Sequence, residues 1–188
     1  MTGRRERKKA ATREALATAA RRLFLERGFD QVTVAEIAAE ADTALSTLFV
    51  HFPGGKEALV LGDGREREQA LTTAVRHRPE GVSILQALHD FLATRGPFDP
   101  EPSPQARRVA DLVIATPALR TYARALWTGC ETALAEVIAE ETGRPVDFSL
   151  RQLARYVLEI PDLAGTDAAP PAALTAAFTR LQRAWPDL

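Results

Sequence analysis

The sequence predicts an all-helical (all-α) fold. Along most of the 188 residues, apolar side chains recur at intervals of three and four, the period of a helix with one buried face. No segment reads convincingly as the alternating pattern of a β-strand. Near the N-terminus, two short helical patterns flank a tight-turn signal, which indicates a helix-turn-helix. We therefore expect a small three-helix unit followed by a larger helical bundle.

Charge is unevenly distributed along the chain. The formal net charge is −1, yet residues 1–27 hold nine Lys and Arg against three Glu, which leaves +6 there and −7 on the remaining 161 residues. A basic end on an acidic body predicts that only this end approaches an anionic partner, and a solvated basic tail is the alternative. Residues 1–9 are expected to be mobile until they meet that partner.

The first helix is expected to follow this tail and to end at Arg27. Its apolar stripe predicts that it packs across the helix-turn-helix as a scaffold. Gly28 is a natural left-handed cap, and Phe29 is placed to fold back onto Phe24. The stripe consists of Leu16, Ala20, Leu23 and Phe24.

Local signals for the start of a helix follow at Thr33. Thr33 precedes Glu36 by three residues, so that the hydroxyl and the carboxylate can cap each other's backbone N–H groups. Val32 and Ile37 occupy the positions of a hydrophobic staple around that cap. A helix over residues 34–40 is predicted. A turn over residues 41–43 should follow, because Asp tolerates left-handed or hydrogen-bonded turn geometry.

The second helix of the motif is predicted over residues 44–52. Its apolar stripe is expected to be buried and consists of Leu45, Leu48, Phe49 and Phe52. The opposite face offers small hydroxyls, a methyl-bearing side chain and an imidazole, which suit phosphates, base edges and a thymine methyl group. An ordinary surface helix is the alternative. That face holds Thr43, Ser46, Thr47, Val50 and His51.

The rest of the chain reads as one helix after another. A long connector is predicted from Lys56 to Arg76, although Gly62 and Gly64 weaken its first turns as a hinge or a point of close packing. Ser83 is expected to cap a helix that ends at Arg95. Four prolines in residues 96–104 predict a loop. Further helices are expected over residues 105–115, 117–143, 149–160 and 171–185.

Several classes of protein find no support in the sequence. Cys130 is the only cysteine, and the three histidines lack metal-ligand spacing, so neither a disulfide nor a metal site is expected. No apolar run approaches the length that spans a membrane, and the basic N-terminus lacks the apolar core of a signal peptide. No cofactor motif or catalytic constellation stands out. We expect a cytoplasmic protein that is not an enzyme.

Residues 12–59 resemble the N-terminal domain of the TetR family of transcriptional regulators. The resemblance is carried by an A-x-x-L-F-x-E-x-G-F run from Ala20, by T-V-x-x-I-A from Thr33 and by T-L-F-x-H-F with K-E-A-L between Thr47 and Leu59. It implies a DNA-binding domain over residues 1–57 that binds operator DNA as half of a homodimer. It also implies a C-terminal domain over residues 58–188 for ligand binding and dimerisation.

The same resemblance assigns roles to single residues. Thr33 and Lys56 should contact phosphates, while Thr47 and His51 should face DNA. Phe49 stands where the family usually has a phosphate-bonding Tyr, so that hydroxyl is lost. Asp42 replaces the typical Gly of the turn. These departures keep open an alternative, a helical protein-interaction module that has lost specific DNA binding.

The second helix of the motif contains no Arg, Asn or Gln, the residues that give bidentate contacts with bases. Direct readout is therefore expected to be modest and to use Ser46, Thr47 and Val50. Basic residues of the N-terminal tail should supply more of the affinity, through the backbone or a minor groove. The predicted DNA-binding residues are Arg4, Arg5, Lys8, Lys9, Thr33, Thr43, Ser46, Thr47, Phe49, Val50, His51 and Lys56.

The last two helices carry apolar residues beyond one core stripe, among them Tyr156 and Ile160 on the first and Leu174 and Phe178 on the second. Similarity to the family implies a four-helix dimer interface there, and an entirely intrachain core is the alternative. An effector pocket in this region would be largely apolar and would favour an apolar small molecule, although such residues also suit plain core. The candidate lining is Phe91, Val109, Leu112, Leu126, Trp127, Cys130 and Tyr156.

Overall fold

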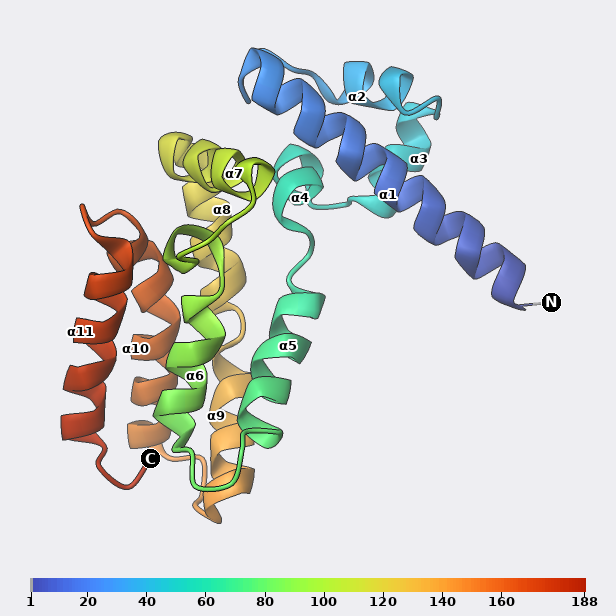
Figure 1. Cartoon of the computed structure of the whole chain (residues 1–188). Coiled ribbons are helices and arrows are strands. Elements are labelled where there is room, and N and C mark those ends of the chain that lie inside the picture. The colour runs from blue at the N-terminus through green and yellow to red at the C-terminus, as the bar shows by residue number, and fades with distance from the viewer. Residues whose placement is uncertain (1) are drawn as a thin grey trace. The chain divides into compact units, whose positions relative to one another are not determined.

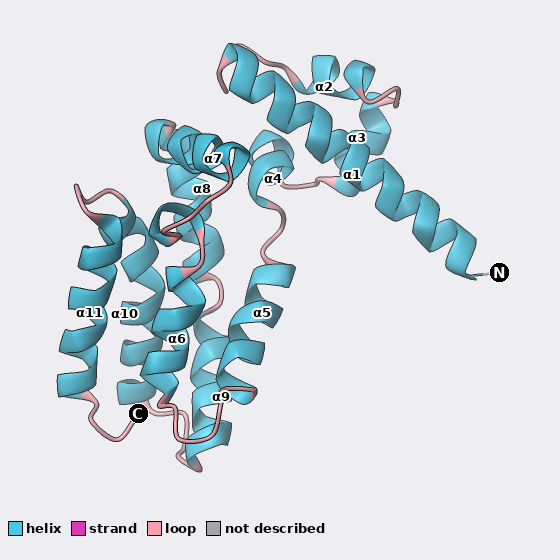
Figure 2. Ribbon diagram, in the orientation of Figure 1, coloured by secondary structure: helices cyan, strands magenta, loops and turns pink. Residues whose placement is uncertain are grey.

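The structure, a computed structural model, describes residues 2–188, and every regular element in that range is a helix (Figure 2). The predicted all-α class is therefore confirmed. The chain divides into two compact units, the first ending at Asp63 and the second beginning at Gly64. None of the helices within residues 2–188 is long and apolar enough to cross a membrane.

The first unit contains four helices built around α1. These are α1 (Thr2–Arg27), α2 (Val34–Glu40), α3 (Leu45–His51) and α4 (Gly55–Leu61). Helix α1 contacts the other three (Figure 1). Leu16, Ile37 and Leu48 are fully buried and supply one core side chain each from α1, α2 and α3. The predicted end of α1 is confirmed, because Gly28 has a φ of +85° and the Phe24 and Phe29 rings lie 5.0 Å apart.

The basic N-terminal segment is helical, which corrects the prediction of a mobile tail. Helix α1 starts at Thr2, and its first turns extend beyond the other helices of the unit with residues 3–11 all exposed (Figure 1); Met1 lies outside the described residues. Arg, Lys, Glu and Ala are strong helix formers, and lengthening an existing helix needs no new nucleus. Local propensity is therefore sufficient to extend the helix where packing is absent.

The predicted connector from Lys56 to Arg76 is two helices. Helix α4 ends at Leu61 and α5 (Arg65–Arg76) starts four residues later. Between them, Gly62 and Gly64 have φ values of +75° and +87°, a backbone region that glycine adopts without a Cβ clash. The two compact units meet at this break. The functional boundary expected at residue 57 stays a prediction.

The second unit is a helical bundle. It contains α5, α6 (Ile84–Ala93), the short 3-10 helix η1 (Gly96–Phe98), α7 (Pro104–Ala115), α8 (Pro117–Thr128), α9 (Glu131–Thr142), α10 (Phe148–Gly165) and α11 (Pro170–Ala184). Helices α5 and α6 pack together, α9 contacts α5 and α10, and α11, at one edge of the bundle, contacts α6 and α10 (Figure 1). The Ser83 hydroxyl accepts the predicted capping bond from the Gln86 N–H group at 3.1 Å.

Two helices of this bundle differ from their predicted lengths. The long helix expected over residues 117–143 is interrupted between Thr128 and Glu131, where Gly129 weakens helical order and Cys130 takes the cap position of α9. Helix α10 continues through Pro161 to Gly165, beyond its expected end near residue 160. Proline removes one backbone donor, but Ile160 and Ala164 on either side are buried, and this packing maintains the helix.

The apolar stripe of α11 belongs to the chain's own core. Leu174 and Phe178 are each 1% exposed, and Ile160 of α10 is also buried, so the expected extra apolar face is wrong at these positions. Tyr156 is exposed as expected, at 47%. Helix α10 additionally exposes Phe148 (79%) and Leu163 (71%). Of the two helices predicted to carry extra apolar surface, α10 therefore has the large exposed apolar side chains.

The turn between α2 and α3 has the predicted left-handed residue. Asp42 has a φ of +49°, and its N–H group donates to the Ala39 carbonyl oxygen at 3.1 Å. The Thr43 N–H group donates to the Ala38 carbonyl oxygen at 2.9 Å. This pair of bonds is the Schellman arrangement, which satisfies the last carbonyl groups of α2 and turns the chain into α3.

Substitution at Asp42 tests this geometry. Asp42→Ala should lower the free energy of unfolding by about 1 kcal/mol, because a Cβ disfavours the left-handed region and alanine lacks the polar side chain that compensates. Asp42→Gly should be at least as stable as the wild type. Urea titrations followed by circular dichroism measure both differences, and equal stability of the two variants would contradict the assignment.

Candidate nucleic-acid interface and effector site

The start of α2 is held by the predicted capping box. The Glu36 N–H group donates to Thr33 Oγ1 at 3.2 Å, and the Thr33 N–H group donates to Glu36 Oε2 at 2.8 Å. Arg27 Nη2 donates to Glu36 Oε1 at 2.7 Å. The Thr33 backbone bond and then the Arg27 side chain lower the pKa of Glu36 to about 2. The charged carboxylate therefore joins the end of α1 to the start of α2.

Helix α3 buries only half of its predicted apolar stripe. Leu48 and Phe52 are in the core, whereas Leu45 is 42% exposed, Phe49 46% and Val50 75%. The expected burial of Leu45 and Phe49 is thus wrong, because a helix of seven residues on the edge of a small unit is covered along one narrow strip. Its outer surface combines these three apolar side chains with the exposed Ser46 and the half-buried Thr47.

The C-terminal end of α3 lies beside the basic part of α1. Arg13 donates through Nη1 to the His51 carbonyl oxygen, and its guanidinium carbon lies 4.4 Å from the centre of the Phe52 ring. Burial lowers the pKa of His51, and the positive charges of Lys9 and Arg13 lower it further. A neutral imidazole is consequently favoured. Its Nδ1 is buried without a hydrogen-bond partner in the described part of the chain.

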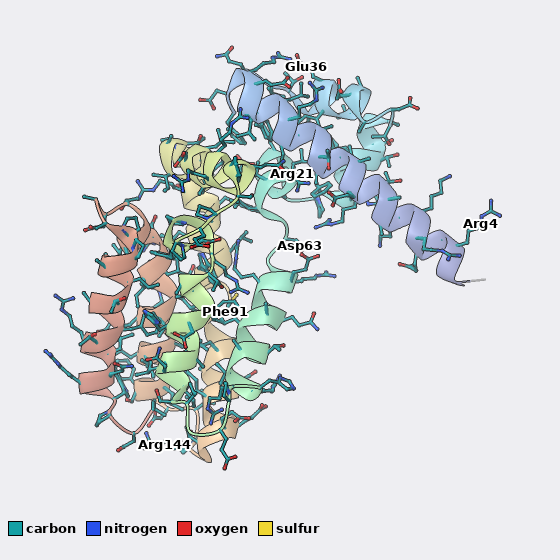
Figure 3. The ribbon with its side chains drawn as sticks, in the orientation of Figure 1. Arg4, Arg21, Glu36, Asp63, Phe91 and Arg144 are labelled. Atoms are coloured by element: carbon teal, nitrogen blue, oxygen red, sulfur yellow. The ribbon has the colours of Figure 1, made fainter. Side chains whose placement is uncertain are left out.

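The remaining cations of the predicted DNA-binding set differ in exposure. Arg4, Arg5, Lys8 and Lys9 are exposed on the free N-terminal turns of α1, where Figure 3 shows Arg4. Lys56 is half-buried, with Nζ 4.2 Å from the centre of the Phe29 ring and 5.6 Å from that of Phe24. Such cation–π contacts give Lys56 a structural partner within its own unit. Thr43 is half-buried in the turn.

The predicted effector residues fall into separate groups. Phe91 on α6, labelled in Figure 3, meets Trp127 of α8 edge to face with ring centres 6.5 Å apart. Cys130 Sγ donates to the Leu126 carbonyl oxygen at 3.3 Å. Val109 and Leu112 are half-buried on α7. Tyr156 packs instead against Trp185, which is not one of the predicted seven, with ring centres 6.2 Å apart.

One residue beside this aromatic pair escaped the sequence reasoning. The Arg67 guanidinium lies over Trp127, 4.7 Å from the ring centre, and its Nη1 is buried without a hydrogen-bond partner among residues 2–188. Burial lowers its pKa, while Cys130 and Tyr122 act in the opposite direction. In the sequence, Arg67 stands in the charged run Arg-Glu-Arg-Glu, which resembles a solvated helix start and offers no signal of burial.

A groove of about 470 Å³ opens between α8 and α10, away from the predicted set. Its three arginines are paired, Arg120 with Asp162 at 3.1 Å, Arg124 with Glu159 at 2.7 Å and Arg155 with Glu131 at 3.1 Å. Arg124 and then Arg155 lower the pKa of Glu159. The charges that line the groove are therefore matched, and none of the seven predicted effector residues lines it.

Two family models match the chain, one in each compact unit. Residues 16–62 match the model described as bacterial regulatory proteins of the tetR family. Residues 82–160 match the model described as the MftR C-terminal domain. The chain belongs to the TetR family. The resemblance drawn from residues 12–59 is thereby confirmed, and the second match adds the C-terminal bundle.

Two relatives of known description support this assignment. MftR of Mycobacterium tuberculosis, named provisionally as a regulator of mycofactocin biosynthesis, is 25% identical over 155 residues, 82% of this chain and 78% of that protein. The HTH-type transcriptional regulator TcmR of Streptomyces glaucescens is 36% identical over 86 residues, 46% of this chain and 38% of that protein. The chain is a TetR-type transcriptional regulator.

Solved structures show the same fold. Salmonella enterica GusR superposes with a TM-score of 0.57 at 23% identity and covers 91% of this chain and 93% of its own. A Mesorhizobium loti protein, described provisionally as a TetR-family transcriptional regulator, gives a TM-score of 0.54 at 15% identity over 94% and 97%. At these identities the likeness concerns the fold alone.

The capping box predicts a pH dependence. Because the pKa of Glu36 is lowered from 4.5 to about 2, its stabilising contribution is complete above pH 4.5 and is lost as the pH falls from 4.5 toward 2. At neutral pH, Glu36→Gln should therefore unfold at a lower urea concentration than the wild type. The difference between the two should shrink steadily on acidification below pH 4.5.

Glu6→Gln is the matched control, since Glu6 is exposed on α1 and takes part in no helix cap. Its unfolding midpoint should follow the wild type at every pH. A wild-type advantage over Glu36→Gln that stays constant across the acid range would show that the carboxylate charge is not what stabilises the cap.

Proposed function

We propose that this transcriptional regulator is a repressor that binds palindromic operator DNA as a homodimer and is released by a small-molecule effector. The proposal rests on the helix-turn-helix: the capped α2, the left-handed turn at Asp42 and the short α3 with its exposed outer face. A separate helical bundle follows it along the chain. In a helix-turn-helix the second helix enters the major groove.

The outer surface of α3 suits contacts with the bases, while phosphate contacts are proposed to come mostly from other residues. Ser46 and Thr47 offer hydroxyls for base edges or phosphates, and the exposed Val50 and Phe49 offer apolar contact with thymine methyl groups. Phosphate contacts are assigned to Thr33, Thr43, His51, Lys56 and the cations of α1. Because the early turns of α1 are helical, Arg4, Arg5, Lys8 and Lys9 are proposed to follow the DNA backbone from one rigid rod.

A protein-interaction module without specific DNA binding is the second candidate. The observation in its favour is the exposure of three apolar side chains on α3, those of Leu45, Phe49 and Val50, which would suit a protein partner as well as thymine methyl groups. An enzymatic role is not proposed. The two relatives are named as regulators, and the buried Cys130, whose pKa is raised by burial, would be a poor nucleophile. A cytoplasmic location follows from the proposed DNA partner.

Selection of bound duplexes from a random pool tests the proposal, with the affinity of the winner measured at several salt concentrations. A palindromic winner with half-sites about one DNA turn apart, or a small multiple of it, is expected from a symmetric dimer. Replacing Arg4, Arg5, Lys8 and Lys9 by Gln should weaken selected and random DNA alike. The salt slope should fall by about one for each phosphate that the variant no longer neutralises.

Glutamine maintains the helix propensity of α1, so any change reports charge rather than folding. Arg107→Gln, exposed on α7, is the control and should leave the slope unchanged. If no sequence is enriched, specific DNA binding fails and the interaction module takes its place. If the four replacements abolish only sequence preference, the assignment of the cations to the backbone is wrong.

The dimer interface is proposed on α10 and α11. Phe148, Tyr156 and Leu163 expose apolar surface along α10, and the outer side of α11 carries the small exposed residues Ala172 and Ala176. Two such helix pairs would form a four-helix contact around the two-fold axis of the dimer.

Leu163→Arg should convert the dimer to monomers in sedimentation velocity, because a charge would be buried without a partner. Binding to the selected palindrome should weaken at the same time. Thr73→Arg, on the exposed side of α5, provides the control and should remain dimeric. A Leu163→Arg protein that sediments as the wild type would place the interface elsewhere.

A further inference from the structure

Arg67 is an arginine turned into the second unit without an acidic partner. It is the third residue of α5, its guanidinium carbon lies 4.7 Å from the centre of the Trp127 ring, and its Nη1 is buried with no hydrogen-bond acceptor among the described residues. None of the ion pairs within residues 2–188 involves Arg67. A well-packed interior rarely leaves such a group unsatisfied, because its lost hydration is not replaced.

The charge of Arg67 persists despite its burial. Burial lowers the pKa of the Arg67 guanidinium, but arginine remains protonated in proteins at neutral pH. The Trp127 face offsets only part of the desolvation. The neighbouring Cys130 does not balance the charge, since burial raises the pKa of its thiol and favours the neutral form. A cation near the start of a helix is also disfavoured by the helix dipole.

A second arginine on the same aromatic pair provides a contrast. Arg95 stacks on Phe91, with its guanidinium carbon 3.6 Å from the ring centre, and it is exposed. Its Nη1 donates to the Phe91 carbonyl oxygen, so the group is satisfied by its own helix end. The Phe91 and Trp127 rings meet edge to face between the two cations. Arg95 is thus exposed and hydrogen-bonded, whereas Arg67 is half-buried and its Nη1 lacks an acceptor in the described part of the chain.

We propose that the effector carries an anionic oxygen group, a carboxylate or sulfonate, which the Arg67 guanidinium receives beside the Trp127 ring. The planar fork of arginine matches such a group through two parallel hydrogen bonds. The apolar body of the ligand then lies against Trp127 and Phe91. This inference rests on the proposed effector-released function, and it narrows the largely apolar effector predicted from the sequence to an amphipathic acid.

Two fluorescent probes separate the anion from the apolar body. Anilinonaphthalene sulfonate and N-phenyl-naphthylamine share the same aromatic skeleton and differ in the sulfonate. The wild-type full chain should bind the sulfonate, and Arg67→Met should weaken that binding about tenfold or more, the effect of losing a charge-assisted hydrogen bond. The affinity for the neutral amine should change less than about twofold, because methionine maintains the apolar volume.

Arg95→Met is the matched control and should leave the affinity for both dyes unchanged. The Tm of the unliganded Arg67→Met protein should rise, because an uncompensated buried charge is removed. A lowered Tm, or equal weakening of both dyes, would give Arg67 a packing role and overturn the proposal. Absence of sulfonate binding to the wild type would overturn it as well.

A competition experiment on the wild-type protein tests the proposal without depending on the folding of any variant. Naphthaleneacetate should displace the bound sulfonate dye about tenfold more effectively than naphthaleneethanol, which has the same ring system without the charge. Equal displacement contradicts the proposal. Binding of the unliganded protein to its selected duplex is measured separately. If the protein does not bind DNA, the proposed function is refuted. If it binds DNA but does not bind the acid, only this inference is refuted.

Discussion

Packing against α1 is the interaction on which the DNA-facing part of this protein depends. Helices α2 and α3 have seven residues each, too few to be stable alone in water. The fully buried Ile37 and Leu48 provide each of them with a contact in the core that α1 organises. The capping box and the left-handed turn then satisfy the backbone groups that such short helices leave unpaired. A small hydrophobic contact and a few local hydrogen bonds thereby support an outward-facing helix.

Gly62 and Gly64 determine the path of the backbone between α4 and α5. Both have positive φ values, and a Cβ at Gly64 would lie 3.2 Å from Leu126 Cδ2 in the bundle. The backbone therefore leaves helical geometry where one compact unit ends and the next begins. Three residues beyond Gly64, Arg67 is held over Trp127. The start of α5 thus follows the break along the chain and carries Arg67 to the aromatic pair.

At a few positions the chain departs from the usual pattern in which apolar side chains are buried and charged side chains are exposed or paired. Arg67 is half-buried and its Nη1 has no acceptor among residues 2–188, while the apolar side chains of Phe49, Val50, Phe148 and Leu163 are exposed. The unpaired buried nitrogen costs stability, and the exposed apolar side chains contribute no burial energy in the isolated chain, so that a partner of matching chemistry would be favourable at both. The groove between α8 and α10 differs in charge balance: its arginines have carboxylate partners, although Nε of Arg120 is also buried without a hydrogen-bond partner among residues 2–188.

The sequence alone determined what depends on neighbouring residues in the chain: the all-helical class, the helix caps at Thr33 and Ser83, the left-handed turn at Asp42 and the end of α1 at Gly28. These features arise from hydrogen bonds and backbone angles within four or five residues, so local patterns are sufficient to predict them. Only the tertiary structure decided which side of each helix is covered. It exposed Leu45 and Phe49, buried the stripe of α11, separated Tyr156 from the other candidate effector residues and turned Arg67 inward. Periodicity reports that a helix has an apolar face, whereas the area covered depends on partners far away in the chain.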